Sequence, residues 1–178
     1  MELAAMGTTL RSVTGAIGWL VSLGIILPLA SAYFLGFSVT KACGLVASAF
    51  FIEYGSIPVG IGLGLPWPYV LPAATSIEAG IFLGLFGLLD SIGSASGLVS
   101  RFLDWTRKVA KRSRLFDRYG IYGLFPIEIL IGVYLCSPAS WLFGWNKWRS
   151  FAITMGGYCV AAIGTTLATL GLIRYFFS

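Results

Sequence analysis

The sequence predicts an all-α integral membrane protein built as an inverted-topology repeat, and three observations support this prediction. Of the 178 residues, 57% are hydrophobic and only 11% are charged, which is less than half of the about 25% typical of soluble domains. The apolar stretches are long and do not alternate with polar residues, as the strands of a membrane barrel would. In each half of the chain, prolines and a carboxylate interrupt one apolar stretch, which is typical of the broken helices of transporters.

The first predicted element is an additional N-terminal transmembrane helix over residues 13–37. No charged residue lies between Arg11 and Lys41, and a helix needs about 20 apolar residues to cross the bilayer. The stretch is too long for the apolar region of a signal peptide, so we expect the chain to retain it. Pro28 should kink this helix, which a membrane helix tolerates where neighbours satisfy the freed backbone groups.

Residues 42–66 are predicted to form a re-entrant hairpin. The apolar run from Ala42 to Ile52 is too short to cross a bilayer. The break that follows has the sequence Glu53-Tyr54-Gly55-Ser56-Ile57-Pro58. An interior proline and the alternating glycines beyond it are unfavourable in a continuous helix. Non-helical backbone at membrane depth is tolerated only inside protein or beside a water-filled cavity.

A second transmembrane helix is predicted over residues 70–98. Its Gly80-x-x-x-Gly84 spacing permits the close approach of another helix. The helix also contains Glu78 and Asp90. Whether these two acids make helix–helix hydrogen bonds or take part in a site stays open at this point.

Residues 101–118 are predicted to form a cytoplasmic loop. Their basic residues outnumber the acidic ones and account for the net charge of +5. A basic cluster between spans marks the cytoplasmic side and could also hold anionic lipid headgroups. The residues assigned to this topological or headgroup role are Arg107, Lys108, Lys111, Arg112 and Arg114. Nucleic-acid binding is the weakest reading, and we expect no nucleic-acid partner.

The second half of the chain repeats this organisation. Residues 119–143 are predicted to form a second re-entrant hairpin, interrupted by Pro126, Glu128 and Pro138. Residues 150–173 are uncharged and long enough to cross the membrane. With the basic loop inside, the two hairpins open to opposite faces, which makes the repeat an inverted one. The sequence therefore predicts a single multi-pass domain in the cell membrane.

The residue counts exclude several kinds of chemistry. The chain has no histidine, so serine–histidine–aspartate catalysis and histidine metal sites are excluded. Its three cysteines lie far apart, which favours small buried hydrophobic residues. No phosphate-binding loop, dinucleotide fingerprint or zinc-protease motif is present. We therefore predict that the protein is not an enzyme and has neither a cofactor nor a metal site.

Two segments resemble a known family. Residues 53–64 are similar to the E-x-R-G-A-I-P-x-G motif of the small multidrug export proteins, and residues 118–124 resemble the R-Y-G-x-x-G-L step of the same family. The resemblance extends over residues 40–175 and implies a membrane transporter. Those proteins are in turn similar in predicted architecture to the DedA/VTT group, which includes lipid scramblases and polyprenyl-phosphate carriers.

The chain departs from the family pattern at two places. Tyr54 stands where the family has an arginine, so this motif offers Glu53 no neighbouring arginine. The usual tip of the second hairpin is replaced by Pro126-Ile127-Glu128 and Cys136-Ser137-Pro138. Nothing in the sequence indicates a drug as cargo.

Glu53 and Glu128 are the central candidate site residues, because one lies inside each interrupted stretch. A carboxylate within the bilayer usually faces a cavity or a partner, and burial favours its neutral form, so that it can take up and release a proton. The inverted repeat would bring the two acids together at the midplane. The remaining candidates for substrate or ion binding are Tyr54, Gly55, Ser56, Pro58, Pro126 and Pro138. The alternative is that each carboxylate only caps backbone amides of its own hairpin.

Three classes of function remain open. The first is a proton- or ion-coupled secondary carrier of a small solute or amphiphile. The second is a lipid or polyprenyl-phosphate flippase or scramblase. The third is a membrane assembly protein that transports nothing, or a membrane enzyme with unusual carboxylate chemistry. The expected partners are membrane lipids and the solute or lipid substrate. We also expect a homodimer, because so small a bundle leaves apolar, glycine-lined faces to pair.

Overall fold

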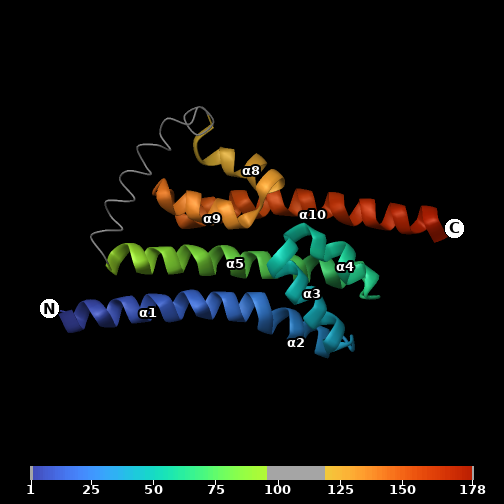
Figure 1. Cartoon of the computed structure of the whole chain (residues 1–178), viewed down its shortest axis with the longest axis horizontal. Helices are drawn as coiled ribbons and strands as arrows, with labels where there is room; N and C mark the ends of the chain where they lie inside the picture. The colour runs from blue at the N-terminus through green and yellow to red at the C-terminus, as the bar shows by residue number, and fades with distance from the viewer. Residues whose placement is uncertain (1, 96–118, 178) are drawn as a thin grey trace.

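The computed structural model describes residues 2–95 and 119–177, and every regular element in these ranges is helical (Figure 1). The elements in chain order are α1 (Glu2–Val21), η1 (Ser22–Ile26), α2 (Leu27–Phe34), α3 (Val39–Ile52), η2 (Glu53–Gly55), α4 (Ser56–Gly62), α5 (Trp67–Ala95), η3 (Gly120–Gly123), α8 (Leu124–Ile131), α9 (Val133–Leu142) and α10 (Lys147–Phe177). The predicted cytoplasmic loop, residues 101–118, lies outside the described residues.

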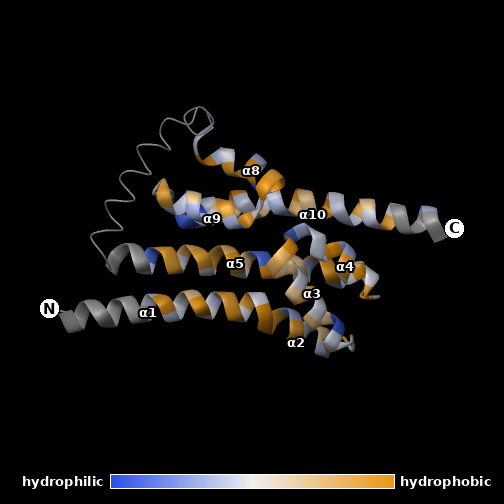
Figure 2. Cartoon of the chain, in the orientation of Figure 1, coloured by the Kyte–Doolittle hydropathy of each residue, from blue (hydrophilic) through white to orange (hydrophobic). Residues whose placement is uncertain are grey.

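The class of protein predicted from the sequence is confirmed at the level of an all-helical membrane protein. Four helical stretches are long and apolar enough to cross a bilayer. By length and composition alone they are Ser12–Phe34, Val39–Gly62, Trp67–Ser91 and Lys147–Gly171, of which Val39–Gly62 is interrupted at Glu53. Figure 2 shows hydrophobic residues distributed along all of these helices. The inverted orientation of the two halves and the re-entrant course of the hairpins stay predictions.

The long helix α5 lies at the centre of the bundle. It packs against α1, α3, α4, α9 and α10, and 67% of its apolar span is buried. The corresponding values are 17% for the first span and 28% for the span in α10. The outer helices therefore expose apolar faces of the kind that lipid covers, whereas α5 can hold polar side chains away from lipid.

A π-helical turn accommodates Pro28 in the first span. In a π-helix each backbone carbonyl accepts a hydrogen bond from the N–H group five residues later. The residue five positions after Leu23 is Pro28, which has no N–H to donate. Ser76 of α5 supplies the missing donor, with its Oγ 2.7 Å from the Leu23 carbonyl oxygen. Tyr69 likewise donates its hydroxyl to the Pro28 carbonyl oxygen at 2.8 Å. Neighbouring side chains thus satisfy the backbone around the proline.

The glycines of α5 allow α1 to approach closely. A Cβ atom at Gly80 would lie 2.7 Å from the backbone nitrogen of Gly24, and one at Gly87 would lie 2.7 Å from the Cβ of Ala16. Gly84 faces Leu20 in the same row, at 3.0 Å. The Gly80-x-x-x-Gly84 spacing is therefore a helix-packing motif between α5 and the first span.

We expect Gly80→Ala to destabilise the protein by about 1–3 kcal/mol, the usual cost of overpacking a well-packed contact. The obstacle is backbone, which cannot rotate aside as a side chain could. Thermal unfolding of the purified protein, followed by loss of helical circular dichroism, measures the effect. Gly18→Ala is the matched control, because Gly18 lies on α1 with nothing near its Cβ position. Equal unfolding temperatures for the two variants would contradict the close packing.

The first predicted hairpin is two short helices that fold back on each other. A Cβ atom at Gly60 of α4 would lie 2.9 Å from Leu45 of α3, and one at Gly44 would lie 3.0 Å from Leu63. This pairing of early with late residues shows that α3 and α4 run antiparallel. The break between them falls at Glu53, as the sequence indicates.

The second hairpin breaks at a different residue from those that the sequence singles out. Pro126 lies in the first turn of α8, where its missing N–H has no helical partner to lose, and Pro138 lies within α9. The chain instead reverses at Gly132, whose φ of 97° is a backbone conformation that favours glycine. Cys136 of α9 then comes back to Leu124, with its Sγ 3.7 Å from that carbonyl oxygen.

Candidate functional site

Three buried carboxylates from distant parts of the chain meet in the bundle. Glu53 lies at the break of the first hairpin, Glu78 on α5 and Glu128 on α8. One carboxylate oxygen from each lies within 4.8 Å of the others. Glu53 is 9% exposed, and both Glu78 and Glu128 are fully buried. We call these three residues the carboxylate cluster.

The backbone at Glu53 is held in an unusual conformation. Its φ of 45° is the only positive value for a non-glycine residue in the described ranges, and such a conformation costs of order 1–3 kcal/mol. The carboxylate accepts hydrogen bonds from the N–H groups of Val133 and Tyr134, at the start of α9. Glu53 therefore caps a helix of the other hairpin, not of its own, and the favourable charge at a helix N-terminus offsets part of the strain.

Gly132 provides the space that this contact needs. A Cβ atom built on Gly132 would overlap the carboxylate group of Glu53. The two chain breaks, Glu53 in the first hairpin and Gly132 in the second, thus lie directly against each other. Any side chain at residue 132 would have to displace the Glu53 carboxylate.

Two tyrosines tie the hairpins together in a reciprocal manner. Tyr54, just after the first break, donates its hydroxyl to the carbonyl oxygen of Glu128 and lies 3.1 Å from its Oε1. Tyr134, just after the second break, donates to the carbonyl oxygen of Phe50, near the end of α3. Each hairpin therefore satisfies a backbone carbonyl at the helix end of the other.

Glu78 has no hydrogen-bond partner for either carboxylate oxygen, and the second oxygen of Glu128 has none. Among the described basic residues, Arg149 is exposed. Lys41 lies against Gly64, and Lys147 lies over aromatic rings. In the described part of the chain, no base is paired with the cluster. Without a base among the described residues, three buried acids are expensive in an apolar bundle, and protons or a cation would lower that cost.

Several buried hydroxyl groups in the described part of the chain have no hydrogen-bond partners, and that of Tyr158 lies within electrostatic range of all three carboxylates. Tyr158 of α10 is fully buried, its hydroxyl has no hydrogen-bond partner, and its ring stacks on Tyr54 with centroids 5.3 Å apart. Ser56 and Thr154 are also fully buried with unpartnered hydroxyl oxygens. Unsatisfied buried polar groups are uncommon in folded proteins, so the unpartnered oxygens of Glu78, Glu128 and Tyr158 point to a site.

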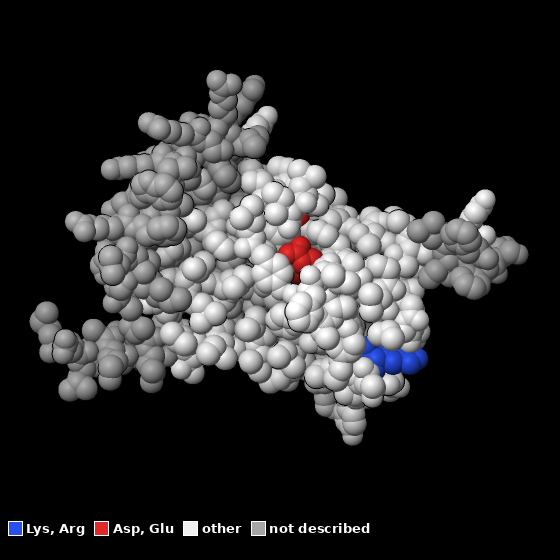
Figure 3. All heavy atoms as spheres, viewed as in Figure 1, with Lys and Arg blue, Asp and Glu red and all other residues white. Residues whose placement is uncertain are grey.

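A shallow cavity opens between the two hairpin tips at Glu53. Its volume is about 370 Å³. The lining residues are Phe51, Ile52, Glu53, Tyr54, Ile129, Leu130 and Ile131. Figure 3 shows acidic atoms among uncharged described residues near the middle of this face, with the coloured basic atoms at the lower right. Glu53 therefore lines this cavity, whereas the other two acids are fully buried.

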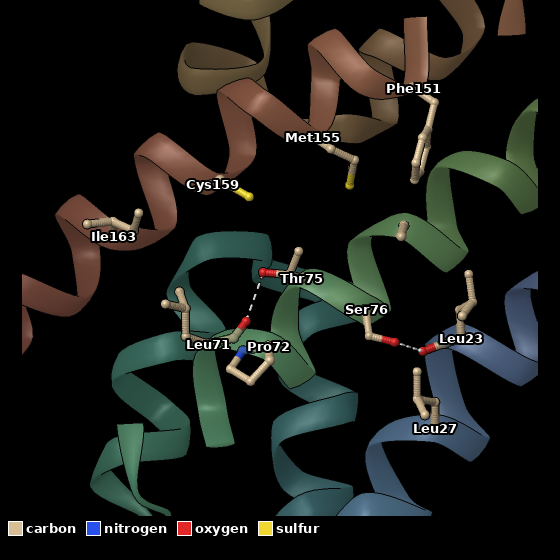
Figure 4. Close-up of a pocket in the computed structure, with 11 residues that line it drawn as sticks. Leu23, Leu27, Leu71, Pro72, Thr75, Ser76, Phe151, Met155, Cys159 and Ile163 are labelled. Atoms are coloured by element: carbon tan, nitrogen blue, oxygen red, sulfur yellow. Dashed lines mark hydrogen bonds between the residues drawn. The ribbon is translucent and has the colours of Figure 1, made fainter. Parts of the chain in front are cut away.

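A second cavity, of about 530 Å³, lies on the side of the bundle between the first span, α5 and α10 (Figure 4). Its polar groups are engaged within the protein, because Thr75 donates to Leu71 and Ser76 donates to Leu23. The exposed lining is otherwise apolar, with Met155 and Ile163 on the α10 side. This lateral cavity suits a hydrocarbon chain and offers nothing to a small polar solute.

The structure brings Glu53 and Glu128 together, as their places in the two hairpins lead one to expect, and Tyr54 bridges the two hairpins. That these residues bind a substrate or ion stays a prediction. Ser56 is buried on α4, whereas Pro58 and Pro126 are exposed and Pro138 is partly buried. The basic candidates Arg107, Lys108, Lys111, Arg112 and Arg114 lie outside the described residues.

Sequence reasoning left the place of Glu78 open and did not find Gly132, Tyr134 or Tyr158. The signal for Glu78 was a carboxylate inside a long apolar span, but Asp90 in the same span gives the same signal. The structure separates them, because Glu78 is fully buried and Asp90 is exposed. Gly132 and the two tyrosines carry no spacing signal, since each acts through a contact with another hairpin or helix.

A family model described as "Putative small multi-drug export protein" matches residues 53–163, more than half of the chain. The match begins at Glu53 and spans all three acids of the cluster. Neither the curated proteins nor the solved structures give a match, so the expected similarity to the DedA/VTT group is not shown. The family is one of exporters and not an enzyme class, and together with the apolar helices it indicates a membrane transporter.

Proposed function

Because the chain belongs to the small multi-drug export protein family, we propose that it is a secondary carrier with its transport site at the carboxylate cluster. The cargo is a small solute or amphiphile, and its movement is coupled to protons or another ion. The single observation that carries this proposal is the meeting of three buried, base-free carboxylates at the tips of two broken hairpins.

Membrane physics supports this assignment. Ionisable residues inside a bilayer are costly and are typical of ion pathways and proton relays. Discontinuous helices are typical of transport sites, because their free backbone groups line a cavity that continuous helices would close. Here the discontinuities at Glu53 and Gly132 lie at the cluster itself.

The contacts between the hairpins supply a coupling mechanism. The Glu53 carboxylate accepts two hydrogen bonds from the start of α9, and a proton on that carboxylate removes its charge and weakens both bonds. The tips are then joined mainly by Tyr54 and Tyr134. Loading the cluster thus changes how tightly the mouth between the hairpins is closed, as alternating access requires.

The lateral cavity favours a second candidate, a lipid or polyprenyl-phosphate flippase or scramblase. Its apolar lining and its position between α5 and α10 suit an acyl or prenyl chain, while a polar headgroup would travel past the cluster. The basic residues 101–118 would attract anionic headgroups. A membrane assembly protein without transport is the third candidate.

Reconstitution into proteoliposomes distinguishes these functions. A carrier is expected to accumulate solute when a proton or sodium gradient is imposed and to stop when the gradient is dissipated. A scramblase is expected to exchange labelled headgroups between leaflets without any gradient. If correctly folded and inserted protein shows neither activity, both transport proposals are contradicted and the assembly function is left.

Two further proposals rest on the sequence alone. The basic segment 101–118 lies in the cytoplasm, because its charge follows the positive-inside rule. The protein pairs as a homodimer in the cell membrane, with lipids as its other partners.

A further inference from the structure

We infer that Glu53, Glu78 and Glu128 form a binding site for a hard divalent cation, with Ca²⁺ or Mn²⁺ as the fitting ions. The sequence predicts no metal site, because it contains no histidine and no metal-binding spacing. The three ligands come instead from three separate helical segments, and only the fold assembles them.

The spacing of the ligands fits one ion. One oxygen from each of the three carboxylates lies within 4.8 Å of the others. Oxygen ligands at about 2.3–2.6 Å from a Ca²⁺ ion are about 4.6–5.2 Å apart when they face each other across it, and closer when adjacent. A single ion can therefore contact all three carboxylates without a change in the backbone. Each carboxylate has lone pairs left for a metal. This holds also for the carboxylates of Glu53 and Glu128, which already accept hydrogen bonds.

A fourth donor, independent of the acids, points to the same place. The hydroxyl of Tyr158 is fully buried and has no hydrogen-bond partner. It lies within electrostatic range of all three carboxylates, and its ring is stacked on Tyr54, whose hydroxyl contacts Glu128. A buried hydroxyl oxygen held beside three acids without a partner is a further oxygen ligand for a cation.

The chemistry of the ligands selects the ion. All the donors are oxygens, which suit Ca²⁺ and Mn²⁺, whereas Zn²⁺ and copper prefer nitrogen or sulfur. Mg²⁺ gives up its waters reluctantly, and two of the three carboxylates are fully buried. Hydrogen bonds stabilise the charge of Glu53 and Glu128 in part, but Glu78 has none. A monovalent ion would leave two of the three negative charges uncompensated.

The ion also has an access route. The cavity between the hairpin tips reaches Glu53, which is the least buried of the three acids. A cation arriving there contacts Glu53 first, and one carboxylate oxygen of Glu53 lies within 4.8 Å of one from each of Glu78 and Glu128. A role for this cation as the coupling or transported ion rests on the proposed function, but its binding can be measured without any transport.

The test measures Mn²⁺ binding to the purified full-length protein by electron paramagnetic resonance, with Ca²⁺, Zn²⁺ and Na⁺ as competitors. Wild-type protein is expected to bind one Mn²⁺, which Ca²⁺ displaces and excess Na⁺ does not. Glu78→Gln should weaken binding by more than the about 10–100-fold that follows loss of an outer-shell group. Asp90→Asn is the matched control, since it removes an exposed carboxylate from the same helix, and it should bind as wild type does.

Tyr158→Phe guards against a folding defect in Glu78→Gln, because it removes only the hydroxyl oxygen and should weaken Mn²⁺ binding about tenfold. Helical circular dichroism verifies that each variant is folded. No saturable Mn²⁺ binding at millimolar concentration would overturn the inference and leave protons alone at the cluster. Equal binding by wild type and a folded Glu78→Gln variant, or displacement by Na⁺, would also overturn it. Binding without transport would instead contradict the carrier, and transport without binding would contradict only the metal site.

Discussion

Glu53→Gln is expected to abolish or uncouple transport while the protein still folds and inserts. Glutamine keeps an oxygen that can accept from the start of α9, where Glu53 now accepts from Val133 and Tyr134, so the helix cap survives. The amide can neither carry a proton nor supply the charge that holds a cation. Glu128→Gln should act in the same direction but more weakly, because the second hairpin departs from the family motif. Initial uptake rates in proteoliposomes measure both effects.

The control for these variants is Asp90→Asn, which removes an exposed carboxylate of α5 outside the cluster and should leave transport unchanged. Glu53→Ala separates charge from capping, because it loses the cap as well and should lower stability by about 1 kcal/mol. If the carboxylates only cap backbone amides, both glutamine variants will transport normally. Wild-type rates and pH dependence in the double glutamine variant would rule out the mechanism.

Among the small residues that the structure describes, we expect Gly132→Ala to have the largest effect on folding. Its φ of 97° disfavours a side chain, at a cost of about 1–3 kcal/mol, and the new Cβ would overlap the Glu53 carboxylate. Either the hairpins separate or Glu53 leaves the start of α9. We therefore expect a lower unfolding temperature and loss of transport, measured on protein purified in detergent and then reconstituted.

A double-mutant cycle identifies the cause of the Gly132→Ala effect. In a Glu53→Ala background the overlap is gone and only the backbone strain remains, so the same glycine change should cost less. Gly164→Ala is the matched control, because Gly164 lies within α10 with nothing near its Cβ position, and alanine favours a helix there by about 1 kcal/mol. Additive effects at residues 53 and 132 would show that the two breaks do not touch.

Both predictions concern the contact between the hairpin tips. Glu53 and Tyr54 of the first hairpin satisfy backbone groups of the second, and Tyr134 does the same in return. Because the bonds run both ways, neither tip can move without breaking hydrogen bonds made by the other. Such a contact favours two discrete arrangements, closed and open, over a gradual loosening.

The sequence by itself determined the class of protein and the approximate places of the helices. Too few charged residues to cover a water-facing surface left a membrane as the only suitable solvent, and the uncharged stretches set the spans. It also located the first break at Glu53, since a carboxylate, a glycine and a proline in close succession disfavour a continuous helix. The Gly80-x-x-x-Gly84 spacing indicated that another helix could approach α5 closely, because only small residues let two backbones approach, and the structure identified that helix as the first span.

Only the tertiary structure decided which polar residues share a site. It joined Glu78 to Glu53 and Glu128, left Asp90 at the surface, and placed the second break at Gly132. Hydropathy could not make these distinctions, because lipid tails are as apolar as a protein interior. A residue facing lipid and a residue facing another helix therefore look alike along the chain. Whether a polar side chain of a helix faces the bundle or the lipid depends on which neighbouring helices pack against it. That packing exists only once the hairpins have folded together.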